Sequence, residues 1–122
     1  MSDEARNYLT SEMETLQAAV FKAGALNAKT LGPTAERHLE NALPLVTVSP
    51  ALEEATYLAV ARIAQFARLL YGQAAIAEIE EARRSTLKAV DALGTVMLAS
   101  LRPQSARTER TDEAALPLPL GG

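Results

Sequence analysis

The glutamates and the one histidine are the residues of this chain whose types could support metal chemistry. The sequence has 15 Asp and Glu residues and a single histidine, His38. A di-iron carboxylate site on helices uses Glu-x-x-His, because ligands three residues apart point at the same metal ion. The residue three positions before His38 is Ala35. We therefore interpret His38 as a surface or packing histidine and expect no metal site.

The densest acidic group is Glu78, Glu80 and Glu81. These residues do not share one face of a helix, and Arg83 and Arg84 follow them closely. We interpret the group as a solvated face, in which Glu80 and Arg84 have the spacing of a favourable i,i+4 pair.

Patterns that indicate catalysis or a bound cofactor are not found. The six glycines form neither a GxGxxG nor a GxSxG motif. The serines and His38 show no arrangement that identifies a nucleophile and its base. The sequence therefore predicts a non-enzymatic protein with no catalytic, cofactor-binding or metal-ligating residue.

Composition limits the partners and the compartment. The net charge is −3 and no run of Lys and Arg forms a basic stripe, so we do not expect nucleic acid as a partner. The longest uncharged window, residues 41–52, contains two prolines and is too short to span a bilayer. The chain has no cysteine, and its acidic N-terminus is unlike a secretory signal. We expect a cytoplasmic protein without a transmembrane segment.

The strongest helix signals, around which we expect the rest of the chain to pack, lie in the second half of the chain. Ser49 suits a helix N-cap, Pro50 the first helical position and Glu53 the first turn. Apolar residues then recur at helical spacing in a main stripe, and a second stripe runs beside it. The main stripe comprises Leu52, Thr56, Ala59, Ile63, Phe66 and Leu70, and the second Val60, Ala64, Ala67 and Tyr71.

Gly72 leaves two alternatives open, the end of one helix before a reversal or a weak point in a continuous helix. The residues that follow, Gln73-Ala74-Ala75-Ile76, include no turn former or N-cap. We therefore expect one long helix over residues 50–101, either straight or bent at Gly72, and spanning roughly 75 Å. A partner chain would have to cover its apolar face. The predicted core and self-association residues are Leu52, Ile63, Phe66, Leu70, Ile76, Ile79, Val90, Leu93 and Met97.

The first half of the chain predicts two shorter helices. The spacing of Leu9, Met13, Leu16, Val20 and Ala23 favours a first helix of about 20 residues between Ser2 and about Leu31, with its ordered part beginning near Thr10 or Ser11 at a capping box. Gly32-Pro33 is expected to end this helix and start a second one over residues 34–43. Residues 44–48 favour an extended, packed connector.

Periodicity ends after Leu101. We expect residues 1–102 to form one helical domain and residues 103–122 a flexible tail. The segment Leu116-Pro117-Leu118-Pro119-Leu120 favours polyproline II and has the composition of a docking peptide.

Residues 48–101 resemble the small structural proteins of R-bodies, the refractile ribbon inclusions of bacteria. The resemblance depends on Ser49-Pro50-Ala51 followed by Tyr57-Leu58, on Gln73-Ala74-Ala75, and on Thr86-Leu87-Lys88-Ala89-Val90 before Leu93-Gly94-Thr95-Val96-Met97-Leu98. The chain departs from it at Glu81, Arg83 and Arg84, where that family tends to have glutamine. The resemblance implies self-assembly.

The sequence as a whole predicts an all-α fold, as a helical bundle or a coiled-coil-like oligomer. The expected function is that of a structural or assembly protein that self-associates through the long helix, with itself or another helical protein as partner. The alternative is a compact bundle that acts as an adaptor, presenting a groove or its Leu116–Leu120 segment to another protein.

Overall fold

A computed structural model of the chain describes residues 2–102, and their side chains from Glu4 onwards. The predicted tail, residues 103–122, and its docking peptide lie outside the described residues. Within residues 2–102 the backbone is helical except for short connections, so the predicted all-α fold is confirmed.

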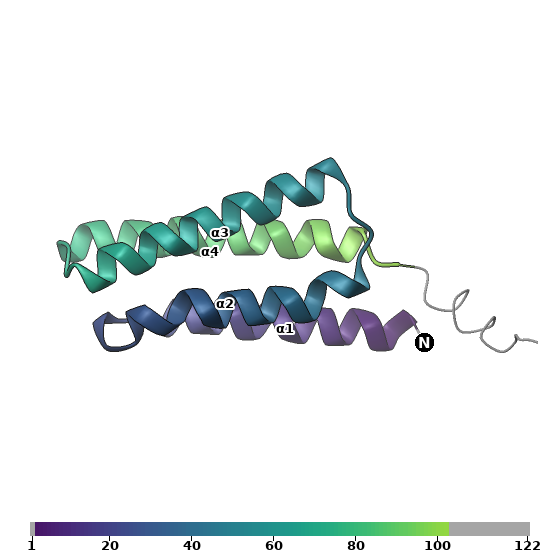
Figure 1. The fold of residues 1–122 in the computed structure, drawn as a ribbon, viewed down its shortest axis with the longest axis horizontal. Helices are drawn as coiled ribbons and strands as arrows, with labels where there is room; N and C mark the ends of the chain where they lie inside the picture. Colours follow the sequence, from purple (N-terminus) through teal and green to yellow (C-terminus); the bar gives the residue numbers. More distant parts are fainter. Residues whose placement is uncertain (1, 103–122) are drawn as a thin grey trace, which may run out of the picture.

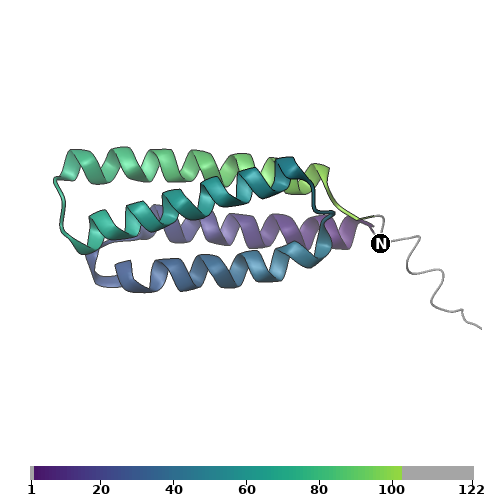
Figure 2. The ribbon, with the colours of Figure 1, turned by 45° about the horizontal axis from the view of Figure 1, so that its top comes forward.

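Residues 2–102 fold as an up-and-down bundle of four α-helices. These are α1 (Ser2–Lys22), α2 (Ala28–Ala42), α3 (Pro50–Tyr71) and α4 (Ile76–Ala99), with 3-10 turns at Ala25–Asn27 and Leu43–Leu45. Figure 1 shows α1 and α2 in one layer and α3 and α4 in the other, and Figure 2 shows the same four helices after a turn of the view. Each helix packs against the next in the chain, and α4 packs back against α1. None of these helices combines the length and the low charge that a bilayer crossing requires.

The core runs along the axis of the bundle and receives one apolar stripe from every helix. The predicted stripe of α1, Leu9 to Ala23, is buried, and so are Leu31, Leu39, Phe66 and Leu93 from the other helices. Burying such side chains contributes about 1.5–3 kcal/mol each relative to exposure. A single chain therefore covers its main apolar faces without a partner.

The predicted boundary between the first two helices was wrong. The chain breaks at Gly24, whose backbone is extended, and Gly32 and Pro33 lie inside α2. Pro33 costs α2 one backbone hydrogen bond. The buried stripe of α2, residues 28, 31, 35, 39 and 42, runs through Pro33 without a break, and its packing outweighs that cost. The α1 helix begins at Ser2, as predicted, but it is helical from there and not only from Thr10 or Ser11; Leu9 is already a core residue.

The connector between α2 and α3 agrees with the prediction only in part, because Pro44 and Leu45 belong to a 3-10 turn and Val48 is exposed. Val46 is extended and fully buried, and it forms an antiparallel bridge with Leu101 after α4. The Thr47 N–H donates to the Ser100 carbonyl at 2.8 Å. The predicted N-cap is also present, because the Ser49 hydroxyl accepts from the Leu52 N–H at 3.1 Å. These contacts fix where α3 begins.

The prediction of one long helix over residues 50–101 was wrong. The α3 helix ends at Tyr71, and the chain reverses into α4 at Ile76. The Ala74 N–H donates to the Leu69 carbonyl at 3.0 Å and the Gln73 N–H to the Leu70 carbonyl at 3.1 Å, which is a Schellman C-cap. The left-handed residue that this motif needs is Gln73, at φ 56°, and not Gly72, at φ −81°. The reversal lets α3 and α4 bury their main apolar stripes against each other.

Candidate functional site: the groove between α2 and α3

Most of the residues predicted for self-association lie inside one chain. Leu52, Ile63, Phe66 and Leu70 of α3 and Val90, Leu93 and Met97 of α4 are buried in the core of the bundle. Ile79 is partly buried against that core, and Ile76, at the start of α4, is 79% exposed. The stripe expected to meet another chain is thus folded onto itself, and any surface for a partner must be found elsewhere.

The second apolar stripe of α3 is the part that the fold leaves open. It consists of Val60, Ala64, Ala67 and Tyr71, and Tyr57 extends it by one step, so that spacings of three and four residues alternate. The exposed fractions are 76% for Tyr57, 47% for Val60 and 62% for Tyr71. This stripe has the period of a helix surface that packs against another helix.

The second stripe borders two adjoining hollows between α2 and α3, which we call the α2–α3 groove. One hollow, of about 660 Å³, is lined by Ala28, Lys29, Ala67, Arg68, Tyr71 and Gly72. The other, of about 330 Å³, is lined by Glu36, Leu39, Val60 and Ile63. Gly32, Pro33 and Ala64 line both hollows. The middle of the groove is therefore walled by small residues, and a Cβ added at Gly32 would meet no atom within 4 Å.

Charge differs between the two ends of the groove. Lys29 and Arg68 lie at the Tyr71 end, and Glu36 lies at the Val60 end. The Lys29 ammonium is 5.2 Å from the centroid of the Tyr71 ring, which is the distance of a cation–π contact. None of these three charged residues forms an ion pair within residues 2–102. The groove thus offers an apolar floor with a cationic end and an anionic end.

A polar cluster between α1 and α2 is another arrangement whose residue types could support chemistry. His38 Nδ1 lies 2.6 Å from a carboxylate oxygen of Glu12, to which Asn41 also donates at 3.5 Å. A carboxylate only accepts, so Nδ1–H is the donor. The hydrogen bond from His38 lowers the pKa of Glu12, although burial of the carboxyl opposes this shift. Residues 2–102 contain no group of three side chains that could hold a metal ion. The cluster ties α1 to α2.

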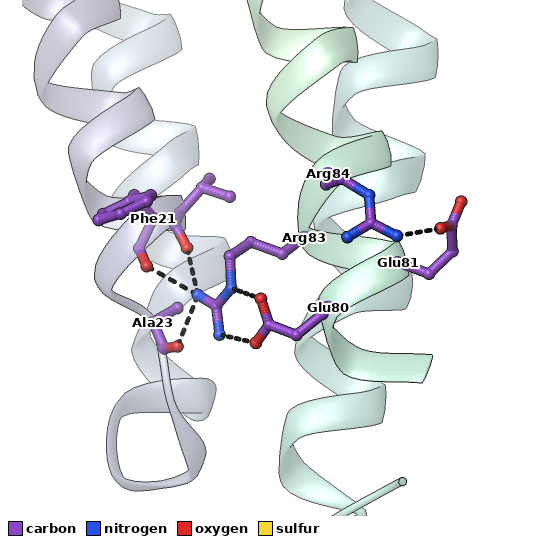
Figure 3. Close-up of polar contacts among 7 residues, drawn as sticks. Phe21, Ala23, Glu80, Glu81, Arg83 and Arg84 are labelled. Atoms are coloured by element: carbon purple, nitrogen blue, oxygen red, sulfur yellow. Dashed lines mark hydrogen bonds and ion pairs between the residues drawn. The ribbon is translucent and has the colours of Figure 1, made fainter. Parts of the chain in front are cut away.

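Arg83 forms a second polar tie, shown in Figure 3, where it reaches from α4 to the end of α1. One terminal nitrogen donates to the carbonyls of Val20 and Phe21 and to that of Ala23, at 3.0, 2.8 and 3.0 Å. The guanidinium also pairs with Glu80 and lies 5.1 Å from the centroid of the Phe66 ring.

Figure 3 also shows Arg84 pointing away from α1 with Glu81. The predicted Glu80–Arg84 pair was wrong, because the pairs formed are Glu80–Arg83 and Glu81–Arg84. Sequence reasoning placed Arg83 on the solvated face. It missed the carbonyls of α1, which are 60 to 63 positions away.

In comparisons with known proteins, no family model matches this chain, and no curated protein or solved structure matches it significantly. The resemblance to R-body proteins therefore stays a prediction. Of the surfaces described, the α2–α3 groove is the one along which an apolar stripe stays exposed, at Val60, Ala64 and Tyr71, although core residues such as Ile63 also line it.

Proposed function

We propose that this protein is a non-enzymatic assembly module that packs against helices of a protein partner at the α2–α3 groove. The observation that carries the proposal is the second apolar stripe of α3, which stays open beside a wall of small α2 residues. Exposed apolar surface of this kind, bordered by charged residues, is typical of protein–protein contact sites.

The shape of the groove favours a helix over other ligands. From Tyr57 to Tyr71 the stripe extends about 21 Å at 1.5 Å per residue, which is about four helical turns. Small residues at its centre, Gly32 and Ala64, let a second backbone approach closely. An apolar stripe on a helix is a recurrent means of recognition, with anchors at i, i+3, i+4 and i+7.

The buried polar groups support a binding role and not a catalytic one. The Glu12–His38 pair joins α1 to α2, and Arg83 joins α4 to the end of α1. Such ties hold the relative positions of the helices. They steady the bundle on which the groove lies, whereas α2 and α3 contact each other directly.

Photo-cross-linking in cells that express the full-length protein tests the proposal. A photoreactive phenylalanine analogue replaces Val60, and in a control it replaces Arg84, whose side chain is 69% exposed on α4. We expect discrete adducts from position 60 only, and their loss when Ala67→Glu is added. Equal adducts at both positions, or none at position 60, would contradict the proposal.

A further inference from the structure

We infer that the occupant of the α2–α3 groove is a second copy of this chain, bound antiparallel about a two-fold axis. This inference rests on the proposed function, since it names the partner of the same groove. The axis lies in the interface, across the groove at its middle. It places α3 on α3 of the partner copy and α2 on α2, so that the two grooves face each other with their ends exchanged.

The first argument is the arrangement of the residues about the middle of the groove. On α3, Tyr57 and Tyr71 each lie seven residues from Ala64. On α2, Lys29 precedes Gly32 by three residues and Glu36 follows Pro33 by three. Ala64, Gly32 and Pro33 are the residues shared by both hollows. One axis through this middle therefore brings Tyr57 of one copy to Tyr71 of the other, and Lys29 to Glu36.

Charge selects the antiparallel arrangement. Exchanging the ends places Lys29 of one copy against Glu36 of the other, twice by symmetry. A parallel arrangement, with the axis along the groove, would bring the two cationic ends together and leave both Glu36 side chains at the other end, away from Lys29 and Arg68. Like charges across an interface are unfavourable, and complementary ones fix orientation and register.

The middle of the groove permits close contact at the axis. Ala64 would face its own copy there, and a small side chain lets two helices approach to the short end of the usual 8–10 Å spacing. Across the groove from Ala64 lies Gly32 of α2, where a Cβ atom, if added, would meet no atom within 4 Å. The aromatic rings of Tyr57 and Tyr71 would close the interface at both ends.

The contact is small for a specific interface. Four turns of two neighbouring helices cover an area at the low end of specific interfaces, which bury about 1,200–2,000 Å² in total. We therefore expect a dimer that forms at micromolar concentration and dissociates on dilution.

Charge reversal tests the register. In sedimentation experiments on the full chain, Lys29→Glu and Glu36→Lys are each expected to raise the dimer dissociation constant by about tenfold. The double variant Lys29→Glu/Glu36→Lys should recover wild-type association, because the pairs reform with exchanged signs. Lys88→Glu, on the exposed surface of α4, is the control and should leave association unchanged.

Disulfide trapping tests the position of the two-fold axis. The chain has no native cysteine, so only the introduced cysteine can form a disulfide. Ala64→Cys should form a disulfide-linked dimer on mild oxidation at concentrations where Ala92→Cys, an exposed site on α4, stays monomeric. Three results would overturn the inference. The double variant Lys29→Glu/Glu36→Lys could fail to recover association, the two cysteine sites could be trapped equally, or the wild-type chain could stay monomeric at high micromolar concentration. A cross-link from position 60 to residues 116–120 of the same chain would overturn it too. If position 60 still cross-links to a different protein, the proposed function stands without the second copy. If it cross-links to nothing, both fail.

Discussion

Arg83 of α4 donates to the carbonyl oxygen of Phe21 at 2.8 Å, across 62 positions of sequence. The contact closes the bundle, because the last carbonyls of α1 have no partner within their own helix. A cation at a helix C-terminus also complements the helix dipole. The end of α1 is thus held by α4, the helix that packs on it, in addition to the local bond of 3.2 Å from the Ala23 N–H to the Val20 carbonyl.

Replacing Arg83 should destabilise the bundle. Arg83→Met keeps the length of the side chain but removes its donors to three carbonyls and to Glu80. We expect a loss of about 1.5–3 kcal/mol in the free energy of unfolding, measured by urea denaturation. Arg84→Met, next in sequence and exposed, is the control and should change it by less than about 0.5 kcal/mol. Equal effects of the two substitutions would show that the carbonyl contacts contribute nothing.

The two phenylalanines of the chain form a matched pair for testing the core. Phe66 is fully buried, whereas Phe21 is 67% exposed. Phe66→Ala should lower the free energy of unfolding by about 3–5 kcal/mol, and Phe21→Ala should change it little. Thermal or urea melts of the two variants make the comparison. Similar losses would contradict the placement of Phe66 in the core.

Acid should weaken the tie between α1 and α2. The pKa of Glu12 is lower in the folded chain than its ordinary value of 4.5. The folded state therefore binds fewer protons, so the stabilisation is present above pH 4.5 and is lost as the pH falls through the folded pKa. Glu12→Gln should show a shallower fall of stability with acid than the wild type. The control is Glu14→Gln, at an exposed position of α1. Parallel pH profiles for wild type and Glu12→Gln would refute this role.

The turn between α3 and α4 has a non-ideal residue at its left-handed position. Gln73 has a φ of 56°, which costs a non-glycine residue about 1–2 kcal/mol. Gln73→Gly should therefore raise the free energy of unfolding by about 1 kcal/mol, although glycine also loses more freedom on folding. Gln73→Val should lower it, since a β-branched residue is poorly tolerated at positive φ. A change of the same sign in both variants would argue against the reversal at this position.

The sequence predicted what depends on neighbouring residues. Helical spacing identified the all-α fold, both stripes of α3 and the Ser49 cap, because these features follow from local periodicity and from side chains close to the backbone they cap. For the candidate site it identified Val60, Ala64, Ala67 and Tyr71 as a second stripe. It could not show that this stripe stays open, because that depends on which helices pack together.

Features that depend on tertiary packing escaped prediction. The reversal after α3 has Gln73 at the left-handed position, where glycine is usual. The sequence therefore did not indicate a reversal, and Gly72 was predicted to be a weak point of a continuous helix. Gly32 and Pro33 were read as a break, whereas α2 runs through them because its core face is continuous. His38 was read alone, because its partner Glu12 is 26 positions away.

The most direct test of the central claim is a dilution series of the ¹⁵N-labelled full chain, followed by amide chemical shifts. If two copies meet at the α2–α3 groove, the shifts that change with concentration should gather at Gly32, Ala64, Ala67 and their neighbours. The same residues should stop responding in Ala64→Glu, whereas Ala92→Glu should behave as wild type. Concentration-dependent shifts at Asp91 and Ala92 on α4 in place of the groove, or none at micromolar to millimolar concentration, would contradict the account.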